Sequence, residues 1–171
     1  FTPLAGIMMG TRSGDVDASI LEYMNKKTGK SLEELTNELN KKSGLLGVSG
    51  ISSDSRDIET AAAEGNERAI LAQEIYAQKI ANYIAMYNNI LGGADVICLT
   101  AGVGENSKIM RKMIIERVSS LGIKLDETKN DFRGEFRLIS TEDSKIPVYV
   151  VPTNEELMIA MDTMDLASQN E

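Results

Sequence analysis

Residues 94–121, ADVICLTAGVGENSKIMRKMIIERVSSL, carry the pattern that decides the fold of this chain. The apolar, β-branched run at 96–99 predicts a short buried strand. A break at 100–106 contains two glycines, after which apolar residues recur at helical spacing until Gly122. Strand, glycine turn and helix in this order are typical of α/β proteins that present backbone N–H groups to a ligand. A tight turn without a ligand explains the same pattern equally well.

The composition bounds the class of protein. A chain of 171 residues, 42% hydrophobic and 26% charged, suffices for one globular domain with a real core. The formal charge of -8 disfavours nucleic acid and anionic membranes as partners, so a few local cations must hold any phosphate ligand. No apolar run is long enough to span a bilayer, and no signal-peptide pattern is present.

The chain has one cysteine and no histidine. A Cys/His zinc site and a histidine general base are therefore excluded, and oxygen-bound Mg²⁺ is the leading metal candidate. Cys98 lies in the apolar strand and is expected to be a small buried hydrophobe. Without an internal disulfide the chain fits a reducing cytoplasm. Because the sequence starts at Phe1, it is expected to be a fragment of a longer protein.

Local signals predict the flanking elements. Ser31 and Glu34 have capping-box spacing and start a helix. Residues 43–57 keep apolar side chains among glycines and serines and are expected to form an ordered loop. Residues 66–91 predict a long helix with apolar residues on more than one face, which indicates burial on two sides, against a sheet and against another element such as a partner subunit. Residues 146–151 predict a strand that leads into a last helix.

Four loops carry polar residues with ligand-binding chemistry: 10–14, 52–57, 102–106 and 153–156. Arg12, between glycines and hydroxyl residues, can bind two phosphate or carboxylate oxygens at once. An ordinary solvated arginine is the simpler interpretation, and the sequence alone favours it. The acceptors, hydroxyl and cation at 54–57 either line a pocket or cap a helix.

Glu155 follows the last predicted strand and lies in the first turn of the last helix. A glutamate there complements the helix dipole or holds Mg²⁺ through water. Together the four loops supply a cation, a nucleoside pocket, a backbone cradle and a metal carboxylate, which are the components of a phosphotransferase. A P-loop enzyme is excluded because the Gly-Lys-Ser/Thr ending is missing.

The segments FTPLAGIMMGTRSGD, SGLLGVSGISSDSRD, TAGVGEN and PTNEELMIA, in this order and at these intervals, resemble the C-terminal part of the acetate kinase family. The resemblance covers the whole chain. It implies an α/β fold, a partial actin-like and sugar-kinase-like ATPase domain whose mixed sheet is flanked by helices, one of them long. It also implies that residues 1–171 are an incomplete C-terminal domain, for nucleotide binding and dimerisation, of a two-domain kinase. The helix at 157–171 would pack toward the missing N-terminal domain.

The same resemblance implies an activity and its partners. ATP and acetate would give acetyl phosphate and ADP reversibly, with Mg²⁺, or alternatively Mn²⁺, in a cytoplasmic homodimer joined through this domain. The fragment is expected to be inactive alone, because the acid pocket and the catalytic aspartate would lie in the N-terminal domain.

Residue by residue, Arg12 matches the catalytic arginine that stabilises charge on the phosphoryl group in flight. Glu155 matches the glutamate associated with Mg²⁺. The residues that match the nucleotide site are Asp54, Ser55, Arg56, Gly102, Val103, Gly104 and Asn106.

Other classes of protein remain open. Propionate kinases share the four motifs. A dinucleotide-binding oxidoreductase is suggested by Gly102-x-Gly104 after a strand, although Ser107 replaces the third glycine. A non-catalytic oligomerisation module is favoured by the long helix, but such a module has no use for Arg12.

Overall fold

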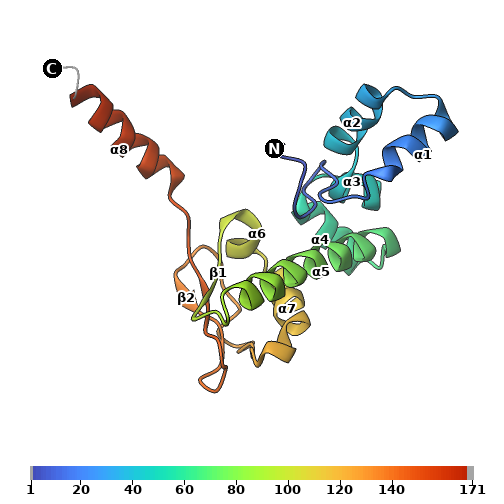
Figure 1. Ribbon diagram of the computed structural model, residues 1–171. Helices are drawn as coiled ribbons and strands as arrows, with labels where there is room; N and C mark the ends of the chain where they lie inside the picture. Colours follow the sequence, from blue (N-terminus) through green and yellow to red (C-terminus); the bar gives the residue numbers. More distant parts are fainter. Residues whose placement is uncertain (1, 169–171) are drawn as a thin grey trace. The chain divides into compact units, whose positions relative to one another are not determined.

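A computed structural model describes residues 2–168 (Figure 1). The chain divides into two compact units, each described by itself below. Unit 1 is Phe1–Gly93 with Met113–Ser120, and unit 2 is Ala94–Lys112 with Leu121–Glu171. Within the described range, no helix is long and apolar enough to cross a membrane. The last three residues of the helix expected at 157–171 lie outside the described residues.

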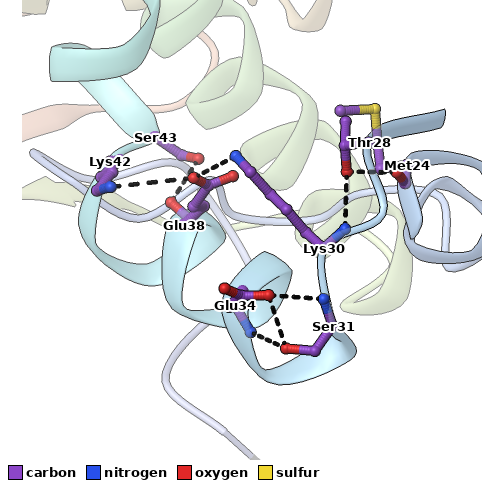
Figure 2. Close-up of polar contacts among 8 residues, drawn as sticks. All are labelled: Met24, Thr28, Lys30, Ser31, Glu34, Glu38, Lys42 and Ser43. Carbon is purple, nitrogen blue, oxygen red and sulfur yellow. Dashed lines mark hydrogen bonds and ion pairs between the residues drawn. The ribbon is translucent and has the colours of Figure 1, made fainter. Parts of the chain in front are cut away.

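Unit 1 begins with five helices. They are α1 (Ser19–Thr28), α2 (Leu32–Lys41), α3 (Gly44–Ser49), α4 (Ser55–Ala63) and α5 (Glu67–Ile90). Figure 2 shows the start of α2, where the Ser31 hydroxyl accepts from the Glu34 N–H at 3.2 Å and the Glu34 carboxylate accepts from the Ser31 N–H at 2.7 Å. The predicted capping box is confirmed, and Lys30 adds an ion pair with Glu38 at 2.7 Å, farther along α2.

Part of the segment expected to be a loop at 43–57 is the short helix α3. Gly44 and Gly50 lie at its two ends with φ of 61° and 70°, so left-handed residues start and stop the helix. Leu45 is buried in a core cluster with Met8 and Ile58. This tertiary packing holds a helix too short to be stable alone, which the local composition did not indicate.

The long helix α5 agrees with its expected bounds, and Asn66 caps it as expected. Its buried face is made largely of alanines, which allow close approach of neighbouring helices. Buried on α5 are Ala69, Ala72, Gln73, Ala77 and Ala81. Among its large apolar residues, Ile75 and Tyr76 pack against the core cluster, whereas Ile70, Leu71 and Ile90 are exposed. The sequence pattern predicts burial of α5 on two sides, but the described residues leave apolar side chains of the helix exposed.

Unit 2 contains the sheet. Its elements are β1 (Ile97–Leu99), α6 (Ala101–Asn106), the first half of α7 (Lys108–Arg117), the end of the 3-10 helix η1 (Ser119–Leu121), β2 (Arg137–Leu138), β3 (Val148–Val150) and α8 (Glu155–Ser168). The strand order is β1-β3-β2, with β1 parallel and β2 antiparallel to β3. The described residues contain a mixed sheet and eight α-helices, so the predicted α/β class is confirmed.

Cys98 corrects one expectation, because its side chain is exposed rather than buried. Cys98 pairs with Tyr149 of β3, whereas its neighbours Ile97 and Leu99 point to the buried face with Val148 and Val150. The continuous apolar run suggested burial on both faces. Among the described residues, only one face of β1 is covered.

Candidate functional site

Arg12 lies in a loop of unit 1 that is held to α2 and to the start of α3. The Ser43 N–H donates to the Thr11 carbonyl at 2.9 Å, and the Ser13 N–H donates to the Leu39 carbonyl at 2.9 Å. Within the loop, the Arg12 carbonyl accepts from the Met9 N–H at 3.0 Å. Backbone bonds on both sides of Arg12 therefore fix where its side chain starts.

Two glycines allow this loop to approach its neighbours closely. A Cβ at Gly44 would lie 2.7 Å from the carbonyl oxygen of Arg12, and one at Gly10 would lie 2.7 Å from the carbonyl oxygen of Ser53. Both separations are shorter than real Cβ contacts. Segments 10–14 and 52–57 thus lie side by side, so the structure brings together two of the four loops singled out in the sequence.

Asp15 closes the same loop. Its carboxylate accepts from the Gly6 N–H at 2.8 Å and from the Tyr83 hydroxyl of α5 at 2.5 Å, while its own N–H donates to the Gly6 carbonyl at 2.9 Å. The Tyr83 hydroxyl and then the Gly6 N–H lower the pKa of Asp15, so the closing carboxylate stays charged.

Arg12 lines an open hollow. The hollow has a volume of about 990 Å³, and its other lining residues are Thr11 and residues of α2, among them Lys41, Asn40 and the carboxylates Glu33 and Glu34. The Arg12 guanidinium contacts the Met9 sulfur at 3.8 Å. Among residues 2–168, no carboxylate forms an ion pair with Arg12, so its guanidinium is suited to bind an anionic ligand.

Asp54 and Arg56 stand at the beginning of α4, with Ser55 as its first residue. The Asp54 carboxylate accepts from the Arg56 N–H at 2.9 Å and forms an ion pair with the Arg56 guanidinium at 2.5 Å. The Arg56 side chain, and then its N–H, lower the pKa of Asp54 to about 2. The helix-cap interpretation of this motif is therefore confirmed for Asp54, which leaves a role in ligand binding to be tested.

Gly102, Val103, Gly104 and Asn106 all lie in α6, so the predicted glycine turn is a short helix. The helix starts at Ala101, which has a φ of 59°, and the Asn106 amide donates to the Gly102 carbonyl at 2.9 Å. A Cβ at Gly104 would lie 3.0 Å from the backbone of Leu99, so Gly104 serves packing on β1. A Cβ at Gly102 would meet open space, where a ligand can reach the backbone.

Glu105 links α6 to the loop before α8. Its carboxylate accepts from the N–H and from the hydroxyl of Thr153, each at 2.9 Å. The Thr153 N–H is the largest cause of the lowered pKa of Glu105; burial opposes this shift, and the Thr153 hydroxyl adds to it. The structure thus brings the loops 102–106 and 153–156 together in unit 2.

Glu155 begins α8 and is exposed, and the side chain of the preceding Asn154 accepts from the Leu157 N–H at 3.1 Å. Residues 2–168 contain no group of three acidic, cysteine or histidine side chains that could hold a metal by themselves. Mg²⁺ commonly keeps several waters and uses one or two carboxylates together with substrate phosphates. A single exposed glutamate fits that type of site.

The candidate residues fall into two groups. Arg12 and residues 54–56 belong to unit 1, whereas the α6 residues and Glu155 belong to unit 2. Sequence reasoning missed the link from Glu105 to Thr153, and it missed Arg111 of α7, which is fully buried. Arg111 shares helical spacing with the apolar residues Ile114, Ile115 and Val118. A cation on this apolar helix face is the feature of the sequence that could have indicated a buried arginine.

Comparison with known proteins defines the class. The sequence model that describes the acetokinase family matches residues 1–161 of this chain. The chain is 55% identical over 170 residues to the acetate kinase of Clostridium novyi (strain NT), covering 99% of this chain and 42% of that protein. It is 57% identical over 170 residues to the acetate kinase of Mycoplasmopsis pulmonis (strain UAB CTIP), covering 98% and 43%. The chain therefore spans less than half the length of these curated relatives.

Solved structures agree. The acetate kinase of Porphyromonas gingivalis aligns with a TM-score of 0.90 at 46% identity, over 97% of this chain and 42% of that one. A propionate kinase from Francisella tularensis subsp. tularensis SCHU S4 aligns with a TM-score of 0.87 at 43% identity, over 93% and 40%. The chain belongs to the acetokinase family, as the four sequence motifs predicted.

Proposed function

We propose that this chain is the nucleotide-binding and dimerisation part of an ATP-dependent kinase of short-chain carboxylates. An acetate oxygen attacks the γ-phosphorus of ATP, the bond from that phosphorus to the bridging oxygen breaks, and the electron pair leaves with ADP. The products are acetyl phosphate and ADP, and the reaction is reversible. The observation that carries the proposal is the pairing of loops: the Arg12 loop approaches Ser53 closely at Gly10, and Glu105 of α6 is bonded to Thr153.

Arg12 is the proposed catalytic residue. Phosphoryl transfer depends on positioning and on stabilising charge over the transferred oxygens, which is the work of a preorganised cation. Backbone bonds on both sides of Arg12 supply the preorganisation, and the adjacent hollow gives access to a ligand.

The nucleotide is proposed to bind at Asp54, Ser55 and Arg56 and at the α6 residues Gly102, Val103, Gly104 and Asn106. The open space at Gly102 supports close approach of a base or ribose to the backbone. Arg56 keeps exposed N–H donors beside its ion pair with Asp54.

Glu155 is the proposed residue for Mg²⁺, with Mn²⁺ as an alternative ion. Bound Mg²⁺ would neutralise charge on the nucleotide phosphates. The carboxylate of Glu155 would hold the ion directly or through water, and the bond between Glu105 and Thr153 keeps the preceding loop in place.

The rest of the proposal concerns assembly. Exposed apolar residues on α5, such as Ile70 and Ile90, support a homodimer formed through this domain. Exposed apolar residues on α8, such as Ile159 and Met164, support packing of 157–171 against an N-terminal domain. The chain alone is then expected to be inactive, and the enzyme is expected to work in the cytoplasm.

A second candidate, propionate kinase, is favoured by the structural match to the Francisella protein. The test is acyl phosphate formation by the intact gene product with Mg-ATP and either acetate or propionate. Wild type should be active with one acid, and Arg12→Ala should lose about 10³-fold or more in kcat, as arginines on transferred phosphate do. Activity unchanged in Arg12→Ala would overturn the role of Arg12 and favour a non-catalytic module; no activity with either acid would overturn the function.

A further inference from the structure

Arg111 is a charged residue inside unit 2 that the proposed chemistry does not use. It lies on α7, and its side chain has 0% exposure. A buried guanidinium is costly unless its N–H groups are hydrogen-bonded. The cost of burying Arg111 must therefore be offset by the hydrogen bonds that its guanidinium makes.

One side of the guanidinium contacts the end of α6. Nη1 of Arg111 donates to the Gly104 carbonyl at 3.0 Å and to the Glu105 carbonyl at 2.9 Å. Carbonyls in the last turn of a helix lack partners within the helix, and a cation there also complements the helix dipole. Arg111 thus fixes the orientation of the last turn of α6.

The other side contacts residues 130–132. Nε donates to the Asn130 side-chain oxygen at 2.6 Å, and Nη2 donates to the carbonyls of Asn130 at 2.7 Å and Phe132 at 3.1 Å. The guanidinium carbon also lies 4.8 Å from the centre of the Phe132 ring. The Asn130 amide in turn donates to the Lys108 carbonyl at 2.9 Å. One planar side chain therefore ties the end of α6 to residues 130–132.

We propose that Arg111 is the positioning residue of the nucleotide site. It holds the backbone of 102–105 where the nucleotide binds, and it acts through α6 without touching the ligand. This role rests on the proposed function. A lysine keeps the charge, but its three donors on one nitrogen cannot bridge the separate acceptors that the guanidinium fork reaches.

The test compares Arg111→Lys with Lys112→Ala in the intact protein. Lys112 is the next residue of α7, and its ammonium pairs with Glu127 at 2.7 Å at the surface. Arg111→Lys should raise the KM for ATP about tenfold or more, while the KM for the acid and kcat at saturating ATP stay within about twofold. The concentration of Mg-ADP that gives half of the maximal protection against thermal unfolding should rise by a similar factor in Arg111→Lys. Lys112→Ala should change none of these values.

Phe132→Leu is the second variant, for the case that Arg111→Lys does not fold. It removes the ring beside the guanidinium, keeps the backbone acceptor, and should shift the KM for ATP in the same direction by a smaller factor. An unchanged KM for ATP in the folded variants, with only a lower melting temperature, would show that Arg111 is merely structural. If wild type makes no acyl phosphate but Mg-ADP protects it better than it protects Arg111→Lys, the function fails and the positioning role stands. No protection of wild type by Mg-ADP would overturn both.

Discussion

Glu105 and Thr153 are joined by two hydrogen bonds, each 2.9 Å long, although they lie 48 residues apart in the chain. Glu105 belongs to α6, and Thr153 precedes the first turn of α8 by two residues. The glycine helix proposed for the nucleotide and the glutamate proposed for Mg²⁺ are therefore parts of one bonded arrangement.

Thr153→Val should raise the pKa of Glu105 part of the way toward its ordinary value of 4.5. The variant removes the hydroxyl donor and keeps the backbone N–H, which is the larger cause of the low pKa. The measurement is the pH titration of the Glu105 carboxyl carbon by NMR. Thr163→Val is the matched control, because the Thr163 hydroxyl donates to a backbone carbonyl of α8. An unchanged Glu105 pKa in Thr153→Val would contradict the link.

The same lowered pKa fixes the sign of a pH effect on stability. The stabilising contribution of charged Glu105 should be fully present above its ordinary pKa of 4.5 and should vanish as the pH falls through its lower folded pKa. Urea unfolding of wild type and Glu105→Gln should therefore differ most at neutral pH and converge in acid. A gap that widened below pH 4.5 would mean that the pKa is raised in the folded state.

Gly44→Ala should disturb Arg12, whereas Gly29→Ala should not. Both glycines have positive φ, 61° and 74°, so each substitution should cost about 1–2 kcal/mol of backbone strain. A Cβ at Gly44 would also press on the Arg12 carbonyl, while one at Gly29 would meet open space. Gly44→Ala should then lower kcat by about tenfold or more, beyond its effect on stability. Equal kcat in the two variants would show that displacing the Arg12 backbone by a Cβ at position 44 does not affect catalysis.

Local signals made much of the fold predictable. The Ser31 and Glu34 capping box, the Asn66 cap and the strand at 148–150 depend on residues close in sequence, and all three form. Exposure of Cys98 was not predictable in this way, because it depends on which face of the sheet other elements cover. The helix α3 likewise depends on burial of Leu45 among distant residues.

The candidate site shows the same division. The motifs located Arg12, Asp54 and Glu155, since their residue types and neighbours carry the chemistry. The partners of Arg111 lie up to 21 residues away and are mostly backbone carbonyls, which residue types do not reveal. For the same reason, only the structure shows that Gly102 meets open space and Gly104 meets β1.

Asn66→Ala should destabilise unit 1 by about 1 kcal/mol, the usual loss for a helix N-cap. The Asn66 side chain accepts from the N–H groups of Arg68 at 3.1 Å and Ala69 at 3.0 Å, at the start of the helix that buries Ala69 in the core. Urea unfolding measures the change. Asn66→Asp keeps the acceptor oxygen and should stay within a few tenths of a kcal/mol of wild type. A similar loss in both variants would show that the cap is not the cause.

Glu155→Gln should raise the Mg²⁺ concentration that gives half-maximal activity, by about tenfold, because a neutral amide is a much weaker ligand than a carboxylate for a hard cation. Glu156→Gln is the matched control. Both glutamates lie in the first turn of α8, so either variant removes one charge near the same helix dipole and should have the same small effect on stability. The measurement is activity against Mg²⁺ at saturating ATP and acid, where Glu156→Gln should stay within about twofold of wild type. Equal shifts in the two variants would assign Glu155 to the helix dipole alone, and the metal site would have to be sought elsewhere.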